Sequence, residues 1–176
     1  MTEIATAYVA LGSNLGDRAR YLYDGVRLLV DATGARARLS PLYETDPVDY
    51  LDQPRFLNGV VELAGALPPP LELLDACLAI EARLGRERAV AQGPRTLDLD
   101  LLLYGDERAA GARLTLPHPR MHLRRFVLAP LADLAPGLVP PGWHETVATA
   151  ARRRAVIEGE SAVRPAGMWA GDHWLA

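Results

Sequence analysis

Cysteine and aromatic residues are scarce in this chain of 176 residues, which has a single cysteine, Cys77, and 6% aromatic residues. One cysteine excludes an internal disulfide and a zinc site built from cysteines, so Cys77, which lies in an apolar run, is expected to be a small core residue. A run of about eighteen apolar residues, as in a membrane helix, is also missing, and no basic segment followed by an apolar one opens the chain. We therefore expect a cytoplasmic protein without a membrane span.

Strong net charge is missing as well. The formal net charge of −3 disfavours broad binding to nucleic acid or to an anionic membrane, although it allows a local basic pocket. Hydrophobic residues make up 49% of the chain and charged residues 23%, which is typical of a globular protein. The length and the lack of internal repeats predict one domain over residues 1–160, followed by a tail over residues 161–176 that has no usable periodicity.

The most informative stretch of the chain is residues 92–104. From Thr96 onward, apolar and other residues alternate, which predicts a β-strand with two unlike faces. One face carries only leucines and is expected in the core: Leu97, Leu99, Leu101 and Leu103. The other face carries two carboxylates, Asp98 and Asp100, and continues into Leu102 and Tyr104. The two carboxylates therefore lie on one face of the strand, and that face is expected to be partly covered.

Two carboxylates in this arrangement can bind metal. Two residues of strand span roughly 6.5–7 Å, so Asp98 and Asp100 can lean onto one cation or each bind one ion of a close pair. A purely structural explanation needs either an exposed strand face or two basic partners, because adjacent buried carboxylates repel each other and lose hydration.

Residues 93–102, Gly-Pro-Arg-Thr-Leu-Asp-Leu-Asp-Leu-Leu, resemble the diagnostic segment of the 6-hydroxymethyl-7,8-dihydropterin pyrophosphokinase family of folate biosynthesis. Residues 10–18, 53–58 and 116–127 resemble further segments of the same family, and they occur in the family's order. Because the resemblance extends from about residue 8 to about residue 138, one accidental motif does not explain it.

The order of the expected elements predicts an α/β (α+β) protein with a βαββαβ core. Strands are expected over residues 4–11, 37–44, 56–63 and 96–104, and helices between Asp17 and Gly34 and over 71–84, 126–134 and 147–157. Pro41 is expected to kink the second strand or to place it at an edge, because proline cannot donate to a sheet ladder. The resemblance implies a ferredoxin-like plan, in which helices pack on a mostly antiparallel sheet.

Phe56 and Asn58 share one face of an expected strand, where a ring and an amide could recognise a heterocycle. Considered alone, such a phenylalanine is more often a core residue, and such an asparagine more often satisfies nearby backbone. The resemblance implies that these two residues bind the pterin, together with Phe126 and the backbone near Thr45 and Val48.

Three arginines, Arg86, Arg88 and Arg95, lie within ten residues of one another, and guanidinium groups suit phosphate oxygens. The alternative for the first two is a solvated surface with Glu87. The resemblance implies that ATP is bound by these arginines, by two later residues and by a glutamate at the end of the second helix: His118, Arg124 and Glu81. It also implies that the catalytic residues are Arg86, Arg95, Asp98 and Asp100, of which the two aspartates would hold two Mg²⁺ ions.

The reaction implied is transfer of pyrophosphate from ATP to 6-hydroxymethyl-7,8-dihydropterin, giving AMP and the pterin diphosphate. The resemblance implies two small-molecule substrates. We expect a monomer with no membrane or nucleic-acid partner. The polar loop over residues 45–54 is too long for a tight turn, and we expect residues 46–52 and 86–92 to move during turnover.

Two other classes of function remain open on the residues alone. The pair Asp98 and Asp100 could serve metal-dependent phosphoester hydrolysis, or glycoside cleavage, which needs no metal and would therefore tolerate a chelator. A ferredoxin-like sheet could also bind single-stranded RNA on exposed aromatic residues. The acidic strand face and the negative net charge argue against that binding.

Overall fold

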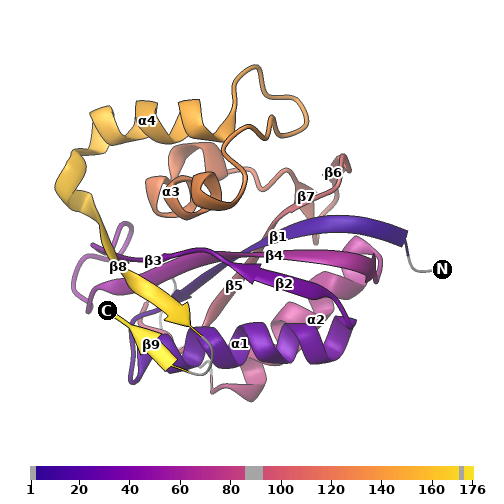
Figure 1. Cartoon of the computed structure of the whole chain (residues 1–176), viewed down its shortest axis with the longest axis horizontal. Helices are drawn as coiled ribbons and strands as arrows, with labels where there is room; N and C mark the ends of the chain where they lie inside the picture. Colours follow the sequence, from indigo (N-terminus) through magenta and orange to yellow (C-terminus); the bar gives the residue numbers. More distant parts are fainter. Residues whose placement is uncertain (1–2, 86–92, 171–172) are drawn as a thin grey trace.

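The computed structural model describes residues 3–85, 93–170 and 173–176. These residues form a seven-stranded sheet in the order β5-β1-β4-β3-β8-β9, with β2 also paired to β4 (Figure 1). Its strands are β1 (Glu3–Ser13), β2 (Arg36–Leu39), β3 (Leu42–Thr45), β4 (Phe56–Leu67), β5 (Asp98–Tyr104), β8 (Val163–Ala170) and β9 (His173–Leu175). Every pairing among the described strands is antiparallel, so the expected antiparallel βαββαβ core is confirmed.

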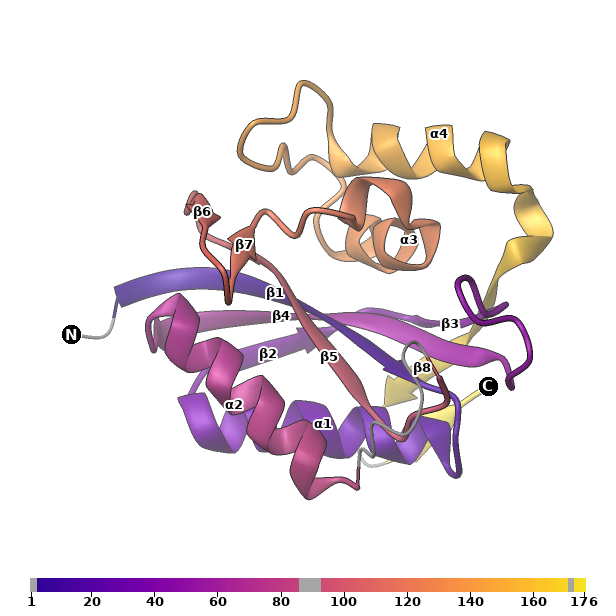
Figure 2. The same cartoon turned by 180° about the vertical axis from the view of Figure 1, so that it is seen from behind.

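Helices cover both faces of this sheet. They are α1 (Arg18–Thr33), α2 (Pro70–Arg83), α3 (Arg125–Leu134) and α4 (Val147–Glu158), with short 3-10 turns η1 (Met121–Leu123) and η2 (Glu160–Ala162). The first two helices lie on one face and α3 on the other, with α4 packed outside α3; a small hairpin, β6 (Ala109–Ala110) and β7 (Thr115–Leu116), lies beside them (Figures 1 and 2). Among the described helices, none has the length and apolar character needed to cross a bilayer.

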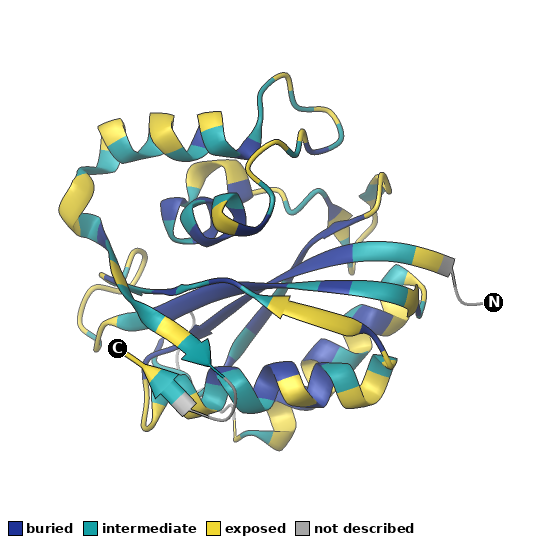
Figure 3. Cartoon of the chain, viewed as in Figure 1, coloured by how far each residue is buried: buried dark blue, intermediate teal, exposed yellow. Residues whose placement is uncertain are grey.

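The central strands are buried on both faces, which explains the nearly continuous apolar run of β1. Val9 and Leu11 pack in the core under α1 and α2, whereas Tyr8 and Ala10 pack in the core under α3. Cys77 of α2 is fully buried in the first of these cores, as predicted. Figure 3 shows the same division, since β1 and β4 are largely buried while β2 and the outer side of α4 are exposed.

Local signals account for the ends of α1. The Asp17 side chain accepts a hydrogen bond from the Arg20 backbone nitrogen at 3.1 Å, which satisfies one of the free donors of the first helical turn. Gly34 ends the helix at φ 67°, a left-handed conformation that suits glycine, and its nitrogen donates to Val30 O at 2.8 Å. Both ends match the sequence prediction.

Pro41 does more than kink the second strand, which was the expectation: it interrupts the strand. The expected strand over 37–44 is divided into β2 and β3, both paired with β4, with Ser40 and Pro41 between them. Ser40 preserves the connection to β4: its backbone nitrogen donates to Val60 O, and its hydroxyl accepts from Val60 N, both at 2.9 Å.

The prediction for β5 was correct up to Leu102, which lies on the face opposite to Leu101, and wrong for Leu103 and Tyr104. Val9 lies opposite Leu101 and Tyr8 lies opposite Leu103, so Leu102 is an extra residue without a partner, as in a β-bulge. The bulge turns Leu103 toward α3 and turns Tyr104 into the opposite core. The two aspartates precede the bulge, so they keep their common face.

The residues after Ser161, which show no periodicity in the sequence, extend the sheet. β8 pairs with β3, and β9 pairs with β8. The ring of Trp169 on β8 stacks on that of Tyr23 on α1, with the ring centroids 4.4 Å apart. This part of the chain therefore packs on the body of the protein.

Candidate active site

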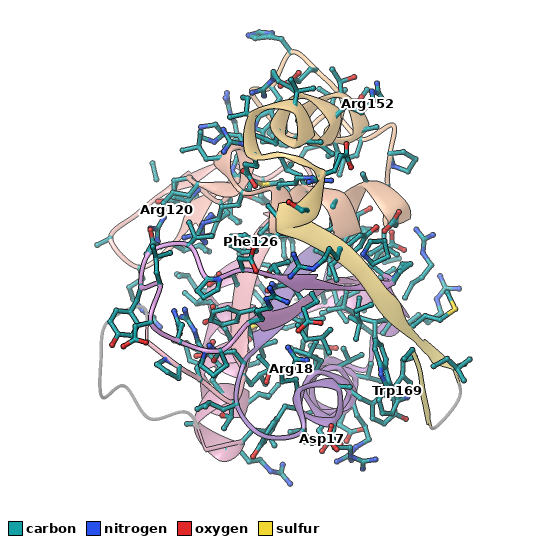
Figure 4. All side chains as sticks on the ribbon, turned by 90° about the vertical axis from the view of Figure 1, so that its left-hand side faces the viewer. Asp17, Arg18, Arg120, Phe126, Arg152 and Trp169 are labelled. Carbon is teal, nitrogen blue, oxygen red and sulfur yellow. The ribbon has the colours of Figure 1, made fainter. Side chains whose placement is uncertain are left out.

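A cleft of about 200 Å³ lies at the end of the sheet where β1 and β3 end and β4 and β5 begin, beneath the start of α3. Figure 4 looks toward this end, with Arg120 and Phe126 between the helical layer and the strands. Neighbouring strands run antiparallel, so one strand ends where its neighbour begins. Residues from four separate parts of the sequence therefore meet at the same edge of the sheet.

Asp98 and Asp100 line the floor of the cleft from β5. Asp98 lies opposite Gly12 of β1, and Asp100 lies opposite Ala10. A side chain at position 12 would displace the amide of Asn58, because a Cβ atom there would be 2.9 Å from Asn58 Oδ1. Gly12 therefore keeps open the space between the carboxylates and the residues of β4.

Two arginine–phenylalanine pairs flank these carboxylates. Arg95 lies over the ring of Phe56 at 5.2 Å, and its Nη1 is 3.4 Å from Asp98 Oδ2. Arg124 lies over the ring of Phe126 at 5.5 Å, and its Nη1 is 3.9 Å from Asp100 Oδ2. The chain contains two phenylalanines in all, and both line this cleft. Each side of the cleft thus combines a flat apolar surface, a cation and a carboxylate.

The wall between these pairs carries Asn58 and Thr45, both buried. Asn58 Nδ2 donates a hydrogen bond to Thr45 Oγ1 at 2.5 Å, across the β3–β4 pairing. This contact orients the amide of Asn58, so the wall presents an ordered polar edge beside the ring of Phe56.

His118 lies in the cleft between two prolines and is electrically neutral there. Burial lowers its pKa to about 4, and the charges of Arg124 and Arg120 act in the same direction. Its Nδ1 accepts a hydrogen bond from the Arg120 backbone nitrogen at 3.2 Å, so the proton of the neutral ring is on Nε2. The imidazole can therefore donate one hydrogen bond without carrying charge.

The cationic side of the cleft is desolvated. Burial lowers the pKa of Arg124, and the charge of Arg120 lowers it further. Arg95 Nε is buried and has no hydrogen-bond partner among the described residues. A buried guanidinium nitrogen without an acceptor favours an anionic ligand at this position.

The two aspartates fit a hard divalent cation. Among the described residues, no group of three or more histidine, cysteine, aspartate or glutamate side chains could hold a metal ion. A pair of carboxylates on one strand face is nevertheless the usual protein contribution to a Mg²⁺ site, because Mg²⁺ takes its remaining ligands from water and from substrate phosphates. Both carboxylates line the cleft and are partly exposed, so they can be reached by such an ion.

Most of the predicted site residues meet in this cleft: Thr45, Val48, Phe56, Asn58, Arg95, Asp98, Asp100, His118, Arg124 and Phe126. Arg86 and Arg88 lie outside the described residues. Glu81 is buried away from the cleft, where its Oε1 accepts a hydrogen bond from Leu99 N at 2.7 Å. The carboxylate thus contacts the strand between Asp98 and Asp100, and its predicted contact with ATP remains a prediction.

Other lining residues were not predicted to bind substrate: Ala10, Leu11, Gly12, Asp46, Asp49, Gln53 and Arg120. Asp46, Asp49 and Gln53 belong to the long polar loop over residues 45–54, whose length and polarity marked the segment in the sequence but not the individual side chains. Arg120 is two residues from His118, and this closeness in sequence could have identified Arg120 as a residue of the cleft.

Comparison with known proteins agrees with this geometry. A family model described as 7,8-dihydro-6-hydroxymethylpterin-pyrophosphokinase (HPPK) matches residues 8–136. The 2-amino-4-hydroxy-6-hydroxymethyldihydropteridine pyrophosphokinase of Bacillus subtilis is 52% identical over 129 residues, covering 73% of this chain and 77% of that one. The protein of the same name from Pseudomonas aeruginosa is 48% identical over 143 residues, covering 80% and 88%.

Solved structures show the same fold in a longer protein. The wild-type HPPK-DHPS of Plasmodium falciparum, crystallised with pterin and p-hydroxybenzoate, superposes with a TM-score of 0.73 at 14% sequence identity. The match covers 96% of this chain and 47% of that one, so the chain spans about half the length of the two-part protein. At this identity the likeness concerns the fold alone.

Proposed function

The chain belongs to the 7,8-dihydro-6-hydroxymethylpterin-pyrophosphokinase family of folate synthesis, and from this membership we propose that its cleft holds ATP and a hydroxymethyl-dihydropterin side by side. In the proposed reaction the hydroxymethyl oxygen attacks the β-phosphorus of ATP. The bond from the β-phosphorus to the oxygen of the α-phosphate breaks, AMP leaves with that oxygen, and the hydroxyl proton is released. The β- and γ-phosphates are transferred as one unit.

The observation that carries the proposal is the convergence of Asp98, Asp100 and both arginine–phenylalanine pairs on one cleft. A planar heterocycle needs aromatic surface, and a polyphosphate needs cations and a metal site. These two requirements are met within the same cavity, as a transfer between the two substrates demands.

The pterin is proposed to bind against Phe56 and Phe126, with the Asn58–Thr45 pair at its polar edge. Apolar rings supply most of the affinity for a flat heterocycle, while an oriented amide discriminates its donors from its acceptors. Val48 also lines the cleft and is 61% exposed, and the proposal includes its contact with the bound ring.

The triphosphate is proposed to bind to Arg95, Arg124 and the Nε2 proton of His118. Guanidinium groups neutralise phosphate oxygens, and a neutral imidazole adds a hydrogen bond without competing for the charge of the carboxylates. In the protein alone, Arg95 and Arg124 face Asp98 and Asp100. Binding of phosphate would give the arginines a stronger anionic partner and leave the carboxylates to a cation.

Asp98 and Asp100 would hold the two Mg²⁺ ions predicted from the sequence. When bound, Mg²⁺ neutralises phosphate charge and helps to orient the reacting groups. The protein's own contribution is to place two carboxylates on one strand face opposite two arginines, so that the phosphates are held between opposite charges. The proposal also includes action as a monomer.

The test is release of AMP from ATP and Mg²⁺, measured with and without 6-hydroxymethyl-7,8-dihydropterin. AMP that forms only with the pterin, and that is lost in Asp98→Ala, would support both the reaction and the metal site. ADP or inorganic phosphate that forms regardless of the pterin would refute the proposal and favour a metal-dependent phosphoester hydrolase.

A further inference from the structure

A short segment near the C-terminus, residues 159–164, contacts both sides of the cleft. It connects α4 to β8 and passes from the helical layer down to the sheet (Figure 1). The family model ends at residue 136, so this segment lies beyond the part of the chain that it matches. We call residues 159–164 the C-terminal strap.

On the sheet side, the strap extends the pairing of β3 up to the cleft. Thr45 lies opposite Val163, and Glu44 lies opposite Arg164. The pairing continues one residue further, where Asp46 N donates to Ala162 O at 3.5 Å. Thr45 and Asp46 both line the cleft, so the strap holds the backbone from which the loop over residues 46–52 begins.

A side-chain contact reinforces this pairing. Arg164 Nη2 lies 3.3 Å from Asp46 Oδ1, and Arg164 Nη1 donates to Ser161 O within the strap. The same Asp46 oxygen is 3.0 Å from the Nε of Arg55, which directly precedes Phe56. Asp46 thus connects the strap to the start of β4, where the stacking ring of the cleft is located.

On the helical side, the strap contacts Arg125, whose side chain is only 10% exposed. Arg125 Nη1 donates to Gly159 O at 2.6 Å, and its Nη2 lies 3.3 Å from Glu160 Oε2. This residue is the first of α3 and stands between Arg124 and Phe126, which both line the cleft. Holding Arg125 therefore holds the start of the helix that carries both residues.

We propose that the C-terminal strap fixes the spacing of the two walls of the cleft, with Arg164 and Arg125 as positioning residues for the pterin. The inference rests on the proposed function, because it assigns the pterin to these walls. The contacts of Arg164 lie on the pterin side, near Thr45 and Phe56, so loosening them affects pterin binding more than ATP binding.

The primary test compares Arg164→Gln with wild type. Arg152→Gln is the matched control, because Arg152 is an exposed arginine that projects from α4 away from the sheet and donates to Thr149 (Figure 4). We expect Arg164→Gln to raise the KM for the pterin about threefold to fivefold, the scale of an exposed ion pair. The KM for ATP and kcat are expected to stay within about twofold, and the control to match wild type.

Two further variants separate positioning from a general loss of structure. In an Asp46→Asn background, Arg164→Gln should produce no additional rise in KM, because its partner is already changed. Arg125→Gln should also raise the KM for the pterin, and to a greater extent, because the Arg125 side chain itself is only 10% exposed. Three results would overturn the proposal. The first is an unchanged KM for the pterin in Arg164→Gln, and the second is an equal rise in the KM for ATP in that variant. The third is that the effects of Arg164→Gln and Asp46→Asn on the KM for the pterin add.

Hydrogen exchange on the ligand-free protein keeps the test independent of catalysis. Arg164→Gln is expected to speed exchange in residues 45–49, and Arg125→Gln in residues 125–129, whereas Arg152→Gln leaves both unchanged. If wild type forms no AMP, the proposed function fails; faster exchange would then still support a strap across the walls of the cleft. Unchanged exchange in both variants overturns the strap proposal, whether or not wild type forms AMP.

Discussion

Asn14 and Arg95 are connected by two hydrogen bonds: Asn14 N donates to Arg95 O at 3.1 Å, and Arg95 N donates to Asn14 Oδ1 at 2.9 Å. The other end of the same amide, Asn14 Nδ2, donates to Gln53 Oε1 at 3.0 Å and to Pro54 O at 2.9 Å. A single buried side chain thus joins the segment before β5 to the loop before β4. Arg95 and Phe56, which face each other in the cleft, depend on this connection for their relative position.

Replacing Asn14 with Asp is expected to destabilise the fold by about 1–3 kcal/mol, because a carboxylate oxygen replaces the donor that faces two acceptors. The KM values for both substrates should rise, since Arg95 and Phe56 both move. Thermal unfolding and steady-state kinetics measure these effects. Gln53→Ala, which removes only one partner of the amide, is the comparison; a larger loss in Gln53→Ala than in Asn14→Asp would contradict the assigned role.

Asp98→Asn and Asp100→Asn are each expected to lower kcat by roughly 10²–10³-fold, the scale of losing one group that stabilises developing charge. Each variant should also need more Mg²⁺ for half-maximal rate. Removing the metal with a chelator should abolish AMP release, and adding Mg²⁺ should restore it. Asp31→Asn, on the exposed side of α1, is the control. Activity that persists in the chelator would exclude the metal site.

Phe56→Leu is expected to weaken pterin binding roughly threefold to tenfold, because leucine keeps much of the apolar volume but loses the aromatic face. Binding of the pterin can be followed by calorimetry in the absence of ATP. Tyr23→Leu serves as the control, since Tyr23 stacks on Trp169 and does not line the cleft. Equal affinity in wild type and Phe56→Leu would rule out stacking on this ring.

The pH dependence of stability should report the neutral state of His118. Its pKa of about 4 in the folded protein lies below the ordinary value of 6.5, so the unfolded chain binds more protons between these two pH values. Stability is therefore expected to decline as pH falls from 6.5 to 4, and less steeply in His118→Gln. Urea unfolding across this range measures the slopes. Identical slopes in the two proteins would show that His118 does not titrate in this way.

The loop over residues 46–52 is expected to close during turnover. Val48 and Leu51 are 61% and 74% exposed in the protein alone, so closure over a ligand would bury apolar surface. Hydrogen exchange should therefore slow in this loop when the pterin and an ATP analogue are both bound. Equal exchange with and without the ligands would contradict a closing loop. The prediction that residues 86–92 also move concerns residues outside the described structure.

The contact of Glu81 and the bulge near the end of β5 could not be predicted from the sequence. Alternation correctly placed Asp98 and Asp100 on one face, because side chains of a strand alternate whatever surrounds them. It could not indicate that Leu102 is a bulge, since a bulge depends on the register with β1. Likewise, the position of Glu81 on α2 was evident, but its contact with Leu99 N depends on how that helix packs against the strand.

The order of the elements, the antiparallel βαββαβ plan and most residues of the cleft could be predicted from local periodicity, turn residues and a resemblance spread over four segments. The contacts between distant side chains could not: Arg95 with Phe56, Arg124 with Asp100, and Arg164 with Asp46. Arg164 and Asp46 are 118 residues apart in sequence. Contacts between such distant residues depend on how strands and helices pack, and no local pattern in the sequence encodes that packing.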